Sequence, residues 1–458
     1  MRVFARQMTE RMKAVAAAGA VAAFWLAVWV FAAALVAQPL ILPGPGAVVV
    51  ALLRLVCDAG TWAILAGSGA RILGGLALAA VCGGLLAGIS SRSQAFVRLV
   101  APALSFVKAT PVACVVVLLL IWLGSARVSI AAVFLMALPG VYFSLVEGLT
   151  QADKPLEQMF RLHGVRGWRL FCAHTWREVL PFVLSCARAV IGMSWKAGVA
   201  AELIGMATGT VGERIYQAKL LIETADLLAW TVLVVAASRA CERVLVWLLR
   251  ASGPVAWRTA VRAHGHGLRG RAGAASDGAA AELALAVGDR APWAPALDGL
   301  VLHVPAGGRT CVMGASGVGK STLLALAAGE CAPCSMVFQD VRLVEGASAL
   351  DNVLVCADAR VDASSAAALL RLLVPGVDVH ARVAELSGGQ RRRVEIARAL
   401  LCPGGAVILD EPFTGLDIAA RDACTEVVLD LLDGRMLLLA THDSADARAL
   451  NISDIITL

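Results

Sequence analysis

Charged residues are scarce in this chain of 458 residues, and long stretches have none. They make up 16% of the sequence, against about 25% in ordinary soluble domains. No charged residue lies between Arg127 and Glu147, and very few lie between Lys13 and Arg92. Hydrophobic residues make up 59%, and the mean hydropathy is +0.77. This composition excludes an ordinary soluble protein and predicts a chain with a large membrane-embedded part.

The apolar residues gather in segments long enough to cross a bilayer, which takes about 20 apolar residues in a helix. Six segments qualify, near 15–37, 70–90, 99–123, 129–148, 181–206 and 226–248. The first segment is longer than the core of a secretory signal, and no small-residue cleavage site followed by a soluble domain accompanies it. We therefore expect six spans.

The net charge of +6 is explained by where the basic residues lie. They precede the first span and follow the second, fourth and sixth spans: Arg2, Arg6, Arg11, Lys13; Arg92, Arg98; Lys154, Arg161, Arg166, Arg169, Arg177; Arg250, Arg258, Arg262, Arg269, Arg271. By the positive-inside rule, both termini are expected in the cytoplasm of a bacterial cell, around an even number of spans in the cytoplasmic membrane. We expect membrane lipid to surround these spans and no nucleic-acid partner, because charge alone is weak evidence for one.

The twelve cysteines lack paired spacing, apart from Cys331 and Cys334. A lone Cys-x-x-Cys can be redox-active or form half of a zinc site. No second pair of cysteines or histidines accompanies it. The sequence therefore favours an accidental pair in a loop, with the other cysteines serving as small apolar residues.

The composition divides the chain into three regions. Residues 1–250 form the predicted membrane domain, and 251–281 are rich in Gly, Ala, Arg and His, which is typical of a linker. Residues 282–458 alternate short apolar runs with helical segments, and the runs are 310–313, 335–338, 406–410 and 435–440. Continuous apolar strands separated by helices predict a parallel sheet buried on both faces. The predicted fold is multi-domain: an all-α domain of six transmembrane helices, followed by an α/β domain.

The α/β region contains a phosphate-binding loop, GASGVGKS, at 314–321. Its glycines let backbone N–H groups curl around phosphate oxygens at a helix N-terminus, and its lysine reaches the terminal phosphates of ATP. The phosphate-binding residues are expected to be Gly314, Ser316, Gly317, Gly319, Lys320, Ser321 and Thr322. Asp410 ends a buried strand and suits Mg²⁺, while Glu411 can orient and polarise an attacking water.

The order of GASGVGKS, VFQD (337–340), LSGGQ (386–390), VILDEP (407–412), TGLD (414–417) and ATHD (440–443) resembles the ATP-binding domains of ABC transporters over essentially all of 282–458. The resemblance implies that Gln339 senses the γ-phosphate and the membrane domain and joins Ser321 and Asp410 around Mg²⁺. His442 would contact the γ-phosphate. The residues implied to contact ATP bound by a second subunit, or to lie at that interface, are Ser387, Gly388, Gly389, Gln390 and Asp417.

Two features depart from that family's pattern. Trp293 is near the place of the aromatic residue that stacks on adenine, but its spacing is imperfect. It is either that residue or a buried aromatic of the sheet. Lys320 and Gln339 are unusually close in sequence, which implies a reduced β-subdomain between them.

The basic stretch after the fourth span contains apolar residues at helical spacing over 156–176, interrupted by Gly164 and Gly167. This pattern predicts two short amphipathic helices around a glycine turn. The stretch resembles the coupling loop of binding-protein-dependent importer permeases. Gln158-Met159 and Arg177 depart from the family's usual residues, whereas Pro181 fits. The alternative is an amphipathic segment that lies only at the membrane surface.

Other parts of the membrane half, at 42–49, 68–75, 108–125 and 194–215, resemble the permeases of nitrate, sulfonate and taurine importers. Lys196 and Glu202 lie inside the fifth span, where charged residues are costly and face the bundle interior. They are about 120° apart around a helix, which disfavours a direct pair. Glu202 is either a translocation-path residue or a buried hydrogen-bonding anchor.

These resemblances imply an importer in which an ABC ATPase is fused to its permease. It would act as a homodimer and receive a small solute, such as nitrate, a sulfonate or taurine, from a separate extracytoplasmic binding protein. A pyrimidine-type vitamin precursor is an alternative solute. An exporter half-transporter is an alternative class, although its spans would extend far into the cytoplasm. A regulatory ATP switch without transport is disfavoured by the intact Glu411 and His442.

Overall fold

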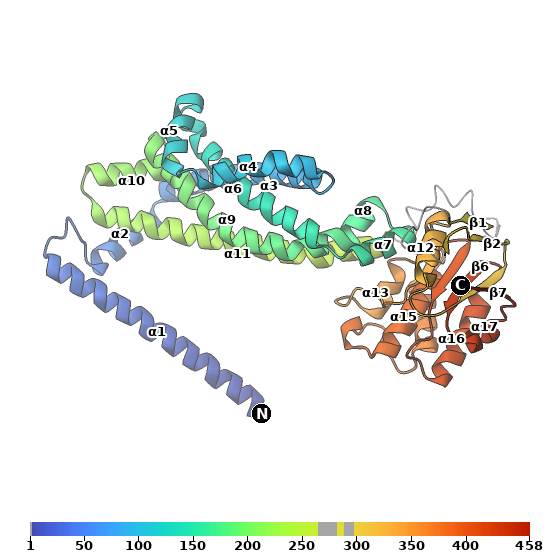
Figure 1. Cartoon of the computed structure of the whole chain (residues 1–458). Helices are drawn as coiled ribbons and strands as arrows, with labels where there is room; N and C mark the ends of the chain where they lie inside the picture. Colours follow the sequence, from blue (N-terminus) through green and yellow to red (C-terminus); the bar gives the residue numbers. More distant parts are fainter. Residues whose placement is uncertain (1, 264–281, 288–296) are drawn as a thin grey trace. The chain divides into compact units, whose positions relative to one another are not determined.

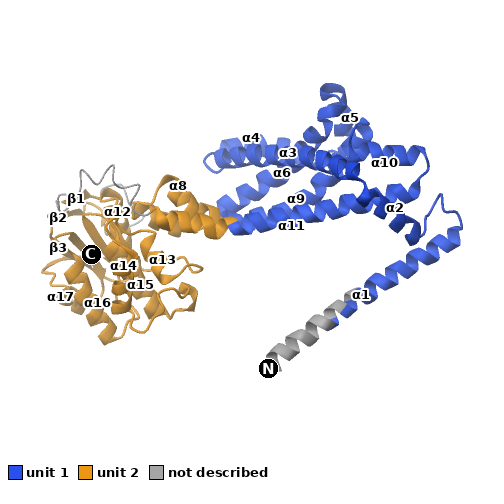
Figure 2. Cartoon of the chain, turned by 180° about the vertical axis from the view of Figure 1, so that it is seen from behind, with its two compact units in different colours: residues 1–151, 179–251 blue, residues 152–178, 252–458 orange. Residues whose placement is uncertain are grey.

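The computed structural model describes residues 2–263, 282–287 and 297–458. The chain forms two compact units (Figure 2). The membrane unit consists of residues 1–151 and 179–251, and the ATPase unit consists of residues 152–178 and 252–458. The segment 152–178 thus packs with the ATPase although it lies within the membrane half of the sequence.

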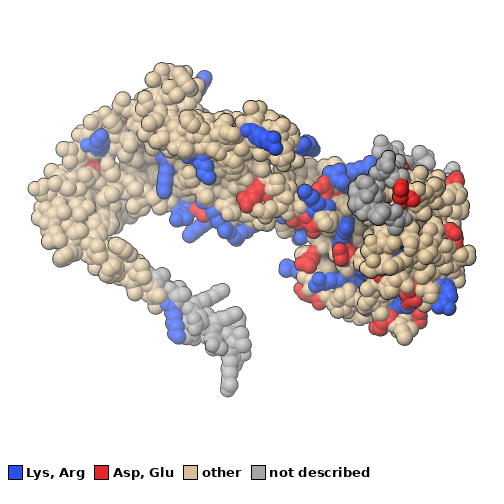
Figure 3. Space-filling view, viewed as in Figure 1, with Lys and Arg blue, Asp and Glu red and all other residues tan. Residues whose placement is uncertain are grey.

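The membrane unit is entirely helical in the described residues, and few charges appear on its surface in Figure 3. Its helices are α1 (Arg2–Val36), α2 (Pro45–Cys57), α3 (Ala59–Ser90), α4 (Gln94–Ala109), α5 (Val112–Leu123), α6 (Ser125–Gln151), α9 (Trp176–Gly205), α10 (Val211–Leu220) and α11 (Thr224–Arg262), of which α9 begins and α11 ends in the ATPase unit. Asp58 begins α3 by accepting hydrogen bonds from the amides of Gly60 and Thr61.

Close packing of α3 against α6 and α9 depends on small residues. A Cβ atom added to Gly75 would lie 2.5 Å from the carbonyl oxygen of Ile130 on α6. One added to Gly198 on α9 would lie 2.5 Å from the side chain of Ile72 on α3. In a membrane, such small residues let helix backbones approach closely enough for van der Waals contact to hold them together.

Four described helices have the length and composition of a membrane span: they contain Gly19–Val36, Ala59–Ser90, Ser125–Gln151 and Gly167–Gly205. The expected span 99–123 is instead two helices, α4 and α5, bent by 103°. The break falls at Pro111, which lacks an N–H group and disfavours helix at the residue before it. The sixth expected span lies in α11, where Arg239, Glu242 and Arg243 interrupt the apolar run. The count of six spans therefore stays a prediction.

The ATPase unit contains a five-stranded parallel sheet in the order β4-β5-β6-β3-β7. Its strands β6 and β7 are labelled in Figure 1. The strands are β3 (Arg309–Met313), β4 (Ser335–Val337), β5 (Ala406–Asp410), β6 (Met436–Thr441) and β7 (Asp454–Thr457). The helices in this part of the chain are α12 (Lys320–Glu330), α13 (Ala349–Leu354), α14 (Ala363–Leu373), α15 (Gly388–Leu401), α16 (Ile418–Leu431) and α17 (Ser444–Ala449). Every residue of β4, β5 and β6 is buried, which confirms the prediction of a parallel sheet covered on both faces.

A second, antiparallel sheet pairs β1 (Leu283–Ala286) with β2 (Val301–Val304). Between Lys320 and Gln339 the chain contains α12 and β4 and no further strand. The expectation of a reduced β-subdomain at this point of the sequence is therefore confirmed.

The first part of the predicted linker at 251–281 is helical in the structure. α11 continues to Arg262, because Trp257 and Ala260 are buried in the ATPase core and stabilise the helix there. Residues 264–281 lie outside the described residues. The boundaries of the three predicted regions stay predictions.

Two neighbouring glycines of α3 offer a test of its packing. We expect Gly75→Ala to destabilise the chain by about 1–3 kcal/mol, because the new methyl group collides with the backbone of α6. Gly74→Ala is the matched control, since nothing lies within 4 Å of its added Cβ and alanine favours helix. Thermal unfolding of the purified chain in detergent measures both. Equal midpoints for the two variants would contradict this packing.

Candidate nucleotide site and coupling segment

The phosphate-binding loop joins the end of β3 to the start of α12. Gly317 and Gly319 have φ angles of +83° and +114°, which residues with a side chain rarely adopt. Gly319 stands at the N-cap of α12 and supplies no side-chain cap to the helix. The first N–H groups of α12 are therefore available to phosphate oxygens, as the sequence motif predicted.

A pocket at this loop gathers the residues expected to bind nucleotide. Its lining consists of Ser316, Gly317, Gly319, Lys320, Ser321, Thr322, Gln339, Asp410 and Glu411. Gly314 lies just outside this lining, where an added Cβ would lie 3.0 Å from Val318 and 3.1 Å from the carbonyl oxygen of Leu458. Gly314 thus keeps room for the end of β7. Trp293 lies outside the described residues.

Lys320 is held at the mouth of this pocket by the loop itself. Its Nζ donates hydrogen bonds to the carbonyl oxygens of Gly314 (2.7 Å) and Ala315 (3.2 Å). The same nitrogen lies 3.9 Å from Oε1 of Glu411. The side chain is buried, so its charge acts on any phosphate in the pocket with little screening by solvent.

Glu411 and His442 meet at the ends of neighbouring strands. Nδ1 of His442 lies 2.9 Å from Oε2 of Glu411, and the Thr414 hydroxyl lies 3.3 Å from the same oxygen. Glu411 has a φ of +48°, a costly conformation for a residue with a side chain. Its amide donates to the carbonyl oxygen of Ala440, which ties it to β6. The hydrogen bond to β6 thus holds Glu411 in this strained backbone conformation, with its carboxylate beside the pocket.

Asp410 is the deepest carboxylate of the pocket. Its Oδ1 is buried and has no hydrogen-bond partner. Burial raises the pKa of Asp410; the Ser321 hydroxyl opposes the rise by hydrogen bonding, and the charge of Glu411 adds to it. An unpartnered carboxylate oxygen beside a hydroxyl and an amide fits a Mg²⁺ ion, which prefers oxygen ligands. Ser321, Asp410 and Gln339 are the residues that would hold it.

The LSGGQ and TGLD motifs have clear local roles but do not line this pocket. Ser387 caps α15 and exchanges hydrogen bonds with Gln390, Ser387 Oγ accepting at 3.3 Å and Gln390 Oε1 at 2.9 Å. Asp417 caps α16 by accepting a hydrogen bond from the amide of Ala420 at 2.8 Å. Ser387 and Gly388 are exposed, and Gly389 packs beside Gly415 of TGLD. Within one chain, Ser387 and Gly388 are therefore exposed outside the pocket.

Residues 152–178, which we call the coupling segment, form two short helices, α7 (Lys154–Leu162) and α8 (Gly167–Leu170), followed by a π-helical turn. Gly164 and Gly167 between them have φ angles of +78° and +56°. The predicted pair of helices around a glycine turn is therefore confirmed. The apolar face of α7 is buried in the core cluster that includes β4 and β5, which is more contact than a surface anchor would make.

The coupling segment supplies hydrogen-bond acceptors to backbone amides at the open edge of the five-stranded sheet, where β4 is the outermost strand. The amide of Met336 donates to Nε2 of His163 at 3.1 Å. The amide of Cys334, just before β4, donates to the carbonyl oxygen of Leu162 at 3.0 Å. Unpaired edge groups are costly when buried, so these bonds tie the segment to the sheet.

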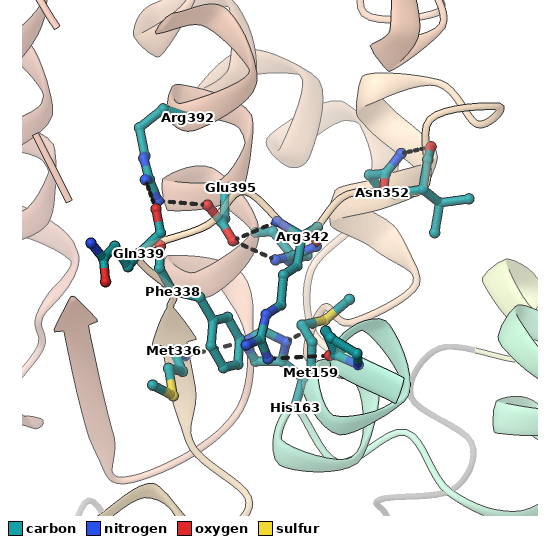
Figure 4. A network of polar contacts seen from close by, with 12 residues as sticks. Met159, His163, Met336, Phe338, Gln339, Arg342, Asn352, Arg392 and Glu395 are labelled. Atoms are coloured by element: carbon teal, nitrogen blue, oxygen red, sulfur yellow. Dashed lines mark hydrogen bonds and ion pairs between the residues drawn. The ribbon is translucent and has the colours of Figure 1, made fainter. Parts of the chain in front are cut away.

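A buried polar network connects this segment to the nucleotide pocket (Figure 4). Arg392 donates to the carbonyl oxygens of Phe338 and Gln339, and its guanidinium lies 2.9 Å from Oε2 of Glu395. The other oxygen of Glu395 accepts from the amide of Arg342 at 3.2 Å. The Arg342 guanidinium in turn reaches α7, donating to the carbonyl oxygen of Pro155 at 3.2 Å and to Oε1 of Gln158 at 3.3 Å.

Glu395 is fully buried at the centre of this network, and Arg398 lies beside it at 3.3 Å. Burial raises the pKa of Glu395, and Arg398 and Arg392 oppose the rise. The sequence analysis did not identify Glu395, Arg392, Arg342 or His163. The only available signal was the polar run RRRVE after LSGGQ, which does not show which residues face the core.

We expect His163 to make the docking of the coupling segment sensitive to pH. Burial lowers the pKa of His163 well below its ordinary value, and the charge of Arg398 lowers it further. A histidine whose pKa is lowered on docking stabilises the docked form above its free pKa, about 6.5, and loses that contribution as the pH falls. We expect hydrogen exchange at the Met336 amide to accelerate as the pH falls below about 6.5, after correction for the intrinsic exchange rate.

His163→Gln should remove this pH dependence, because the amide oxygen still accepts from Met336 but does not titrate. His380→Gln is the control, since His380 is exposed in the same unit. Exchange measured by mass spectrometry on the full chain reads out the β4 peptide. A pH profile that is the same in wild type and His163→Gln would contradict this role of His163.

Two family models match the chain. One describes the binding-protein-dependent transport system inner membrane component and matches residues 80–251. The other describes the ABC transporter family and matches residues 332–414.

Relatives and solved structures are similar to the ATPase part. The aliphatic sulfonates import ATP-binding protein SsuB 1 of Rhizobium johnstonii is 37% identical over 175 residues, covering 33% of this chain and 64% of that protein. SsuB of Escherichia coli strain K12 is 37% identical over 179 residues, covering 34% and 68%. The chain thus spans about two thirds of the length of these relatives. A dimeric, post-hydrolysis structure of the ATP-binding cassette MJ0796 with ADP and Pi is 25% identical with a TM-score of 0.33, covering 36% of this chain and 86% of that one.

The pocket at the phosphate-binding loop, the motifs around it and the match to importer permeases agree with one another. The chain belongs to the ABC transporter family and carries a permease of the binding-protein-dependent importer type together with an ABC ATPase domain.

Proposed function

We propose that this protein couples ATP hydrolysis to the import of a small solute of the aliphatic sulfonate class across the bacterial cytoplasmic membrane. The relatives' role in sulfonate import supports the solute class. A separate extracytoplasmic binding protein would deliver the solute, as the match to a binding-protein-dependent permease suggests. Both termini would lie in the cytoplasm, since the basic residues follow the cytoplasmic pattern.

The observation that carries the proposal is the position of Gln339. It lines the nucleotide pocket, and its backbone carbonyl belongs to the network that reaches α7. The coupling segment joins α6 to α9, so it is continuous in sequence with two membrane helices. A change at the γ-phosphate position therefore has a short, packed and hydrogen-bonded route to the segment that the permease supplies.

At the site itself, the loop amides and Lys320 would bind the β- and γ-phosphates and hold them in line with an attacking water. Glu411 would orient and polarise that water, with His442 keeping its carboxylate in place at 2.9 Å. Bound Mg²⁺ would neutralise charge that develops on the phosphate oxygens. Lys320 would then be a fixed positive charge that stabilises negative charge on the γ-phosphate as it is transferred to water.

We further propose that two copies act together. The exposed Ser387 surface and the pocket are separate within one chain, whereas the motif resemblance implies that both contact the same ATP. A two-fold dimer satisfies both conditions, because Ser387 of one copy would then face Lys320 of the other, and the reverse contact would form at the same time.

Glu411→Gln tests the chemistry. We expect it to retain ATP binding and to slow hydrolysis by about 10² or more, because positioning of the water is lost. Lys320→Ala should instead weaken ATP binding. The measurements are ATP binding and hydrolysis by the purified chain, and uptake of labelled ethanesulfonate by cells producing the chain with the binding protein encoded beside it. The proposed function would be wrong if Glu411→Gln took up ethanesulfonate at the normal rate. It would also be wrong if the wild-type chain showed no ATP-dependent uptake.

Two tagged heterodimers test the shared site and give opposite outcomes for the two arrangements. If each ATP lies between copies, a Lys320→Ala subunit paired with a Ser387→Arg subunit keeps one intact site, whereas wild type paired with the double variant keeps none. If each copy works alone, the second pair is active and the first is not. We expect hydrolysis in the first heterodimer and background rates in the second after purification through both tags.

A further inference from the structure

Lys196 lies inside α9, within a helix that has the composition of a span. It lies nine residues before the end of α9, about 13 Å along the helix axis. That distance is longer than a lysine side chain, so Lys196 cannot place its ammonium group at the end of this helix. A charged group at such a depth faces the protein interior or a water-filled path.

Glu202, the acidic residue six positions after Lys196 on the same helix, is paired. Glu202 is fully buried and accepts from Nε of Arg71 at 3.1 Å and from the Ser68 hydroxyl at 2.8 Å. Glu202 is therefore a hydrogen-bonding anchor between α3 and α9, which answers the question that the sequence left open. In the part of the chain that the structure describes, Lys196 makes neither a hydrogen bond nor an ion pair.

Lys196 opens into a cavity of about 330 Å³ between α5, α6 and α9. The cavity is lined by Val112, Met136, Met193, Lys196, Ala197 and Ala200. Lys196 is the only one of these six with a polar side chain. The volume suits a small molecule, and pockets that bind small molecules commonly combine apolar walls with one or two polar groups that fix orientation.

We propose that this cavity is a binding site in the permease for a small organic anion with a short apolar tail. The ammonium group of Lys196 pairs with the anionic head, and the methionine and alanine side chains contact the tail. Flexible methionines accommodate tails of different shape. This inference rests on the proposed function and assigns the chemistry of its solute to a particular residue of the membrane unit.

The charges around the site favour an anion over a zwitterion or a cation. No carboxylate lines the cavity, so a cationic group on the solute would have no partner there. Arg188 lies eight residues before Lys196 on α9, and both side chains are exposed. It too makes no hydrogen bond or ion pair with the described residues. α9 thus carries two unpaired positive charges about two helical turns apart. Their combined field attracts anions to this helix.

The test measures binding without transport, using the full chain in lipid nanodiscs and labelled ethanesulfonate as the probe. We expect Lys196→Met to weaken ethanesulfonate binding by about tenfold or more, because the charge-assisted hydrogen bond is lost. Lys196→Arg should keep most of the affinity. Lys219→Met removes a lysine from the last turn of α10, outside the cavity, and should bind as wild type does. Ethyl methyl sulfone, a neutral analogue, should bind wild type and Lys196→Met equally weakly.

Three results would overturn the inference: unchanged ethanesulfonate affinity in Lys196→Met, equal binding of the neutral sulfone and the sulfonate by wild type, or no binding of ethanesulfonate by wild type. ATP hydrolysis measured on the same preparations separates this inference from the proposed function. Binding that depends on Lys196 in a chain that hydrolyses no ATP would refute the proposed function alone. ATP-driven uptake with binding indifferent to Lys196 would refute this inference alone.

Discussion

The open edge of the five-stranded sheet is the constraint on which the arrangement of the ATPase unit depends. β4 is only three residues long and has a strand on one side alone. The buried amides of Met336 in β4 and of Cys334 just before it need acceptors, and the coupling segment supplies them through His163 and Leu162. A segment 173 residues away in sequence thereby becomes part of the ATPase core. The backbone amides at this sheet edge have their acceptors in the coupling segment, so the ATPase core is incomplete without this piece of the permease sequence.

The same strand leads directly to the nucleotide. Gln339 follows β4 by two residues and lines the pocket, so the strand that binds the coupling segment and the residue proposed to sense the γ-phosphate share one short piece of backbone. Arg392 and Glu395 on α15 brace that piece from the other side. Ser387, which we propose to face a second copy, is the N-cap of α15. One helix thus connects the proposed dimer surface, the pocket and the coupling segment, and buried ion pairs make its position costly to change independently.

The sequence predicted those parts that depend on backbone conformation and on apolar runs. The glycines of the phosphate-binding loop and Gly164 mark positive φ angles, and the buried strands of the parallel sheet appear as continuous apolar runs. The network around Glu395 was missed because a run of three arginines does not show which guanidinium turns inward. The bend at Pro111 has a local signal, the proline itself, which a search for long apolar runs does not use. The extension of α11 to Arg262 depends on tertiary packing that local composition does not contain.

Charge is used differently in the two units. In the ATPase unit, Glu395 is fully buried, and its charge is compensated by Arg392 and Arg398. Such a rigid, paired cluster suits a network that links the coupling segment to the nucleotide pocket. In the membrane unit, the Arg71–Glu202 pair plays the same structural part between α3 and α9. Lys196 lacks such compensation and opens into a cavity with apolar walls. An unpaired cation beside apolar walls costs free energy unless an anion binds there or passes by. The unpaired charge of Lys196 is therefore the place where we propose that a transported anion would bind.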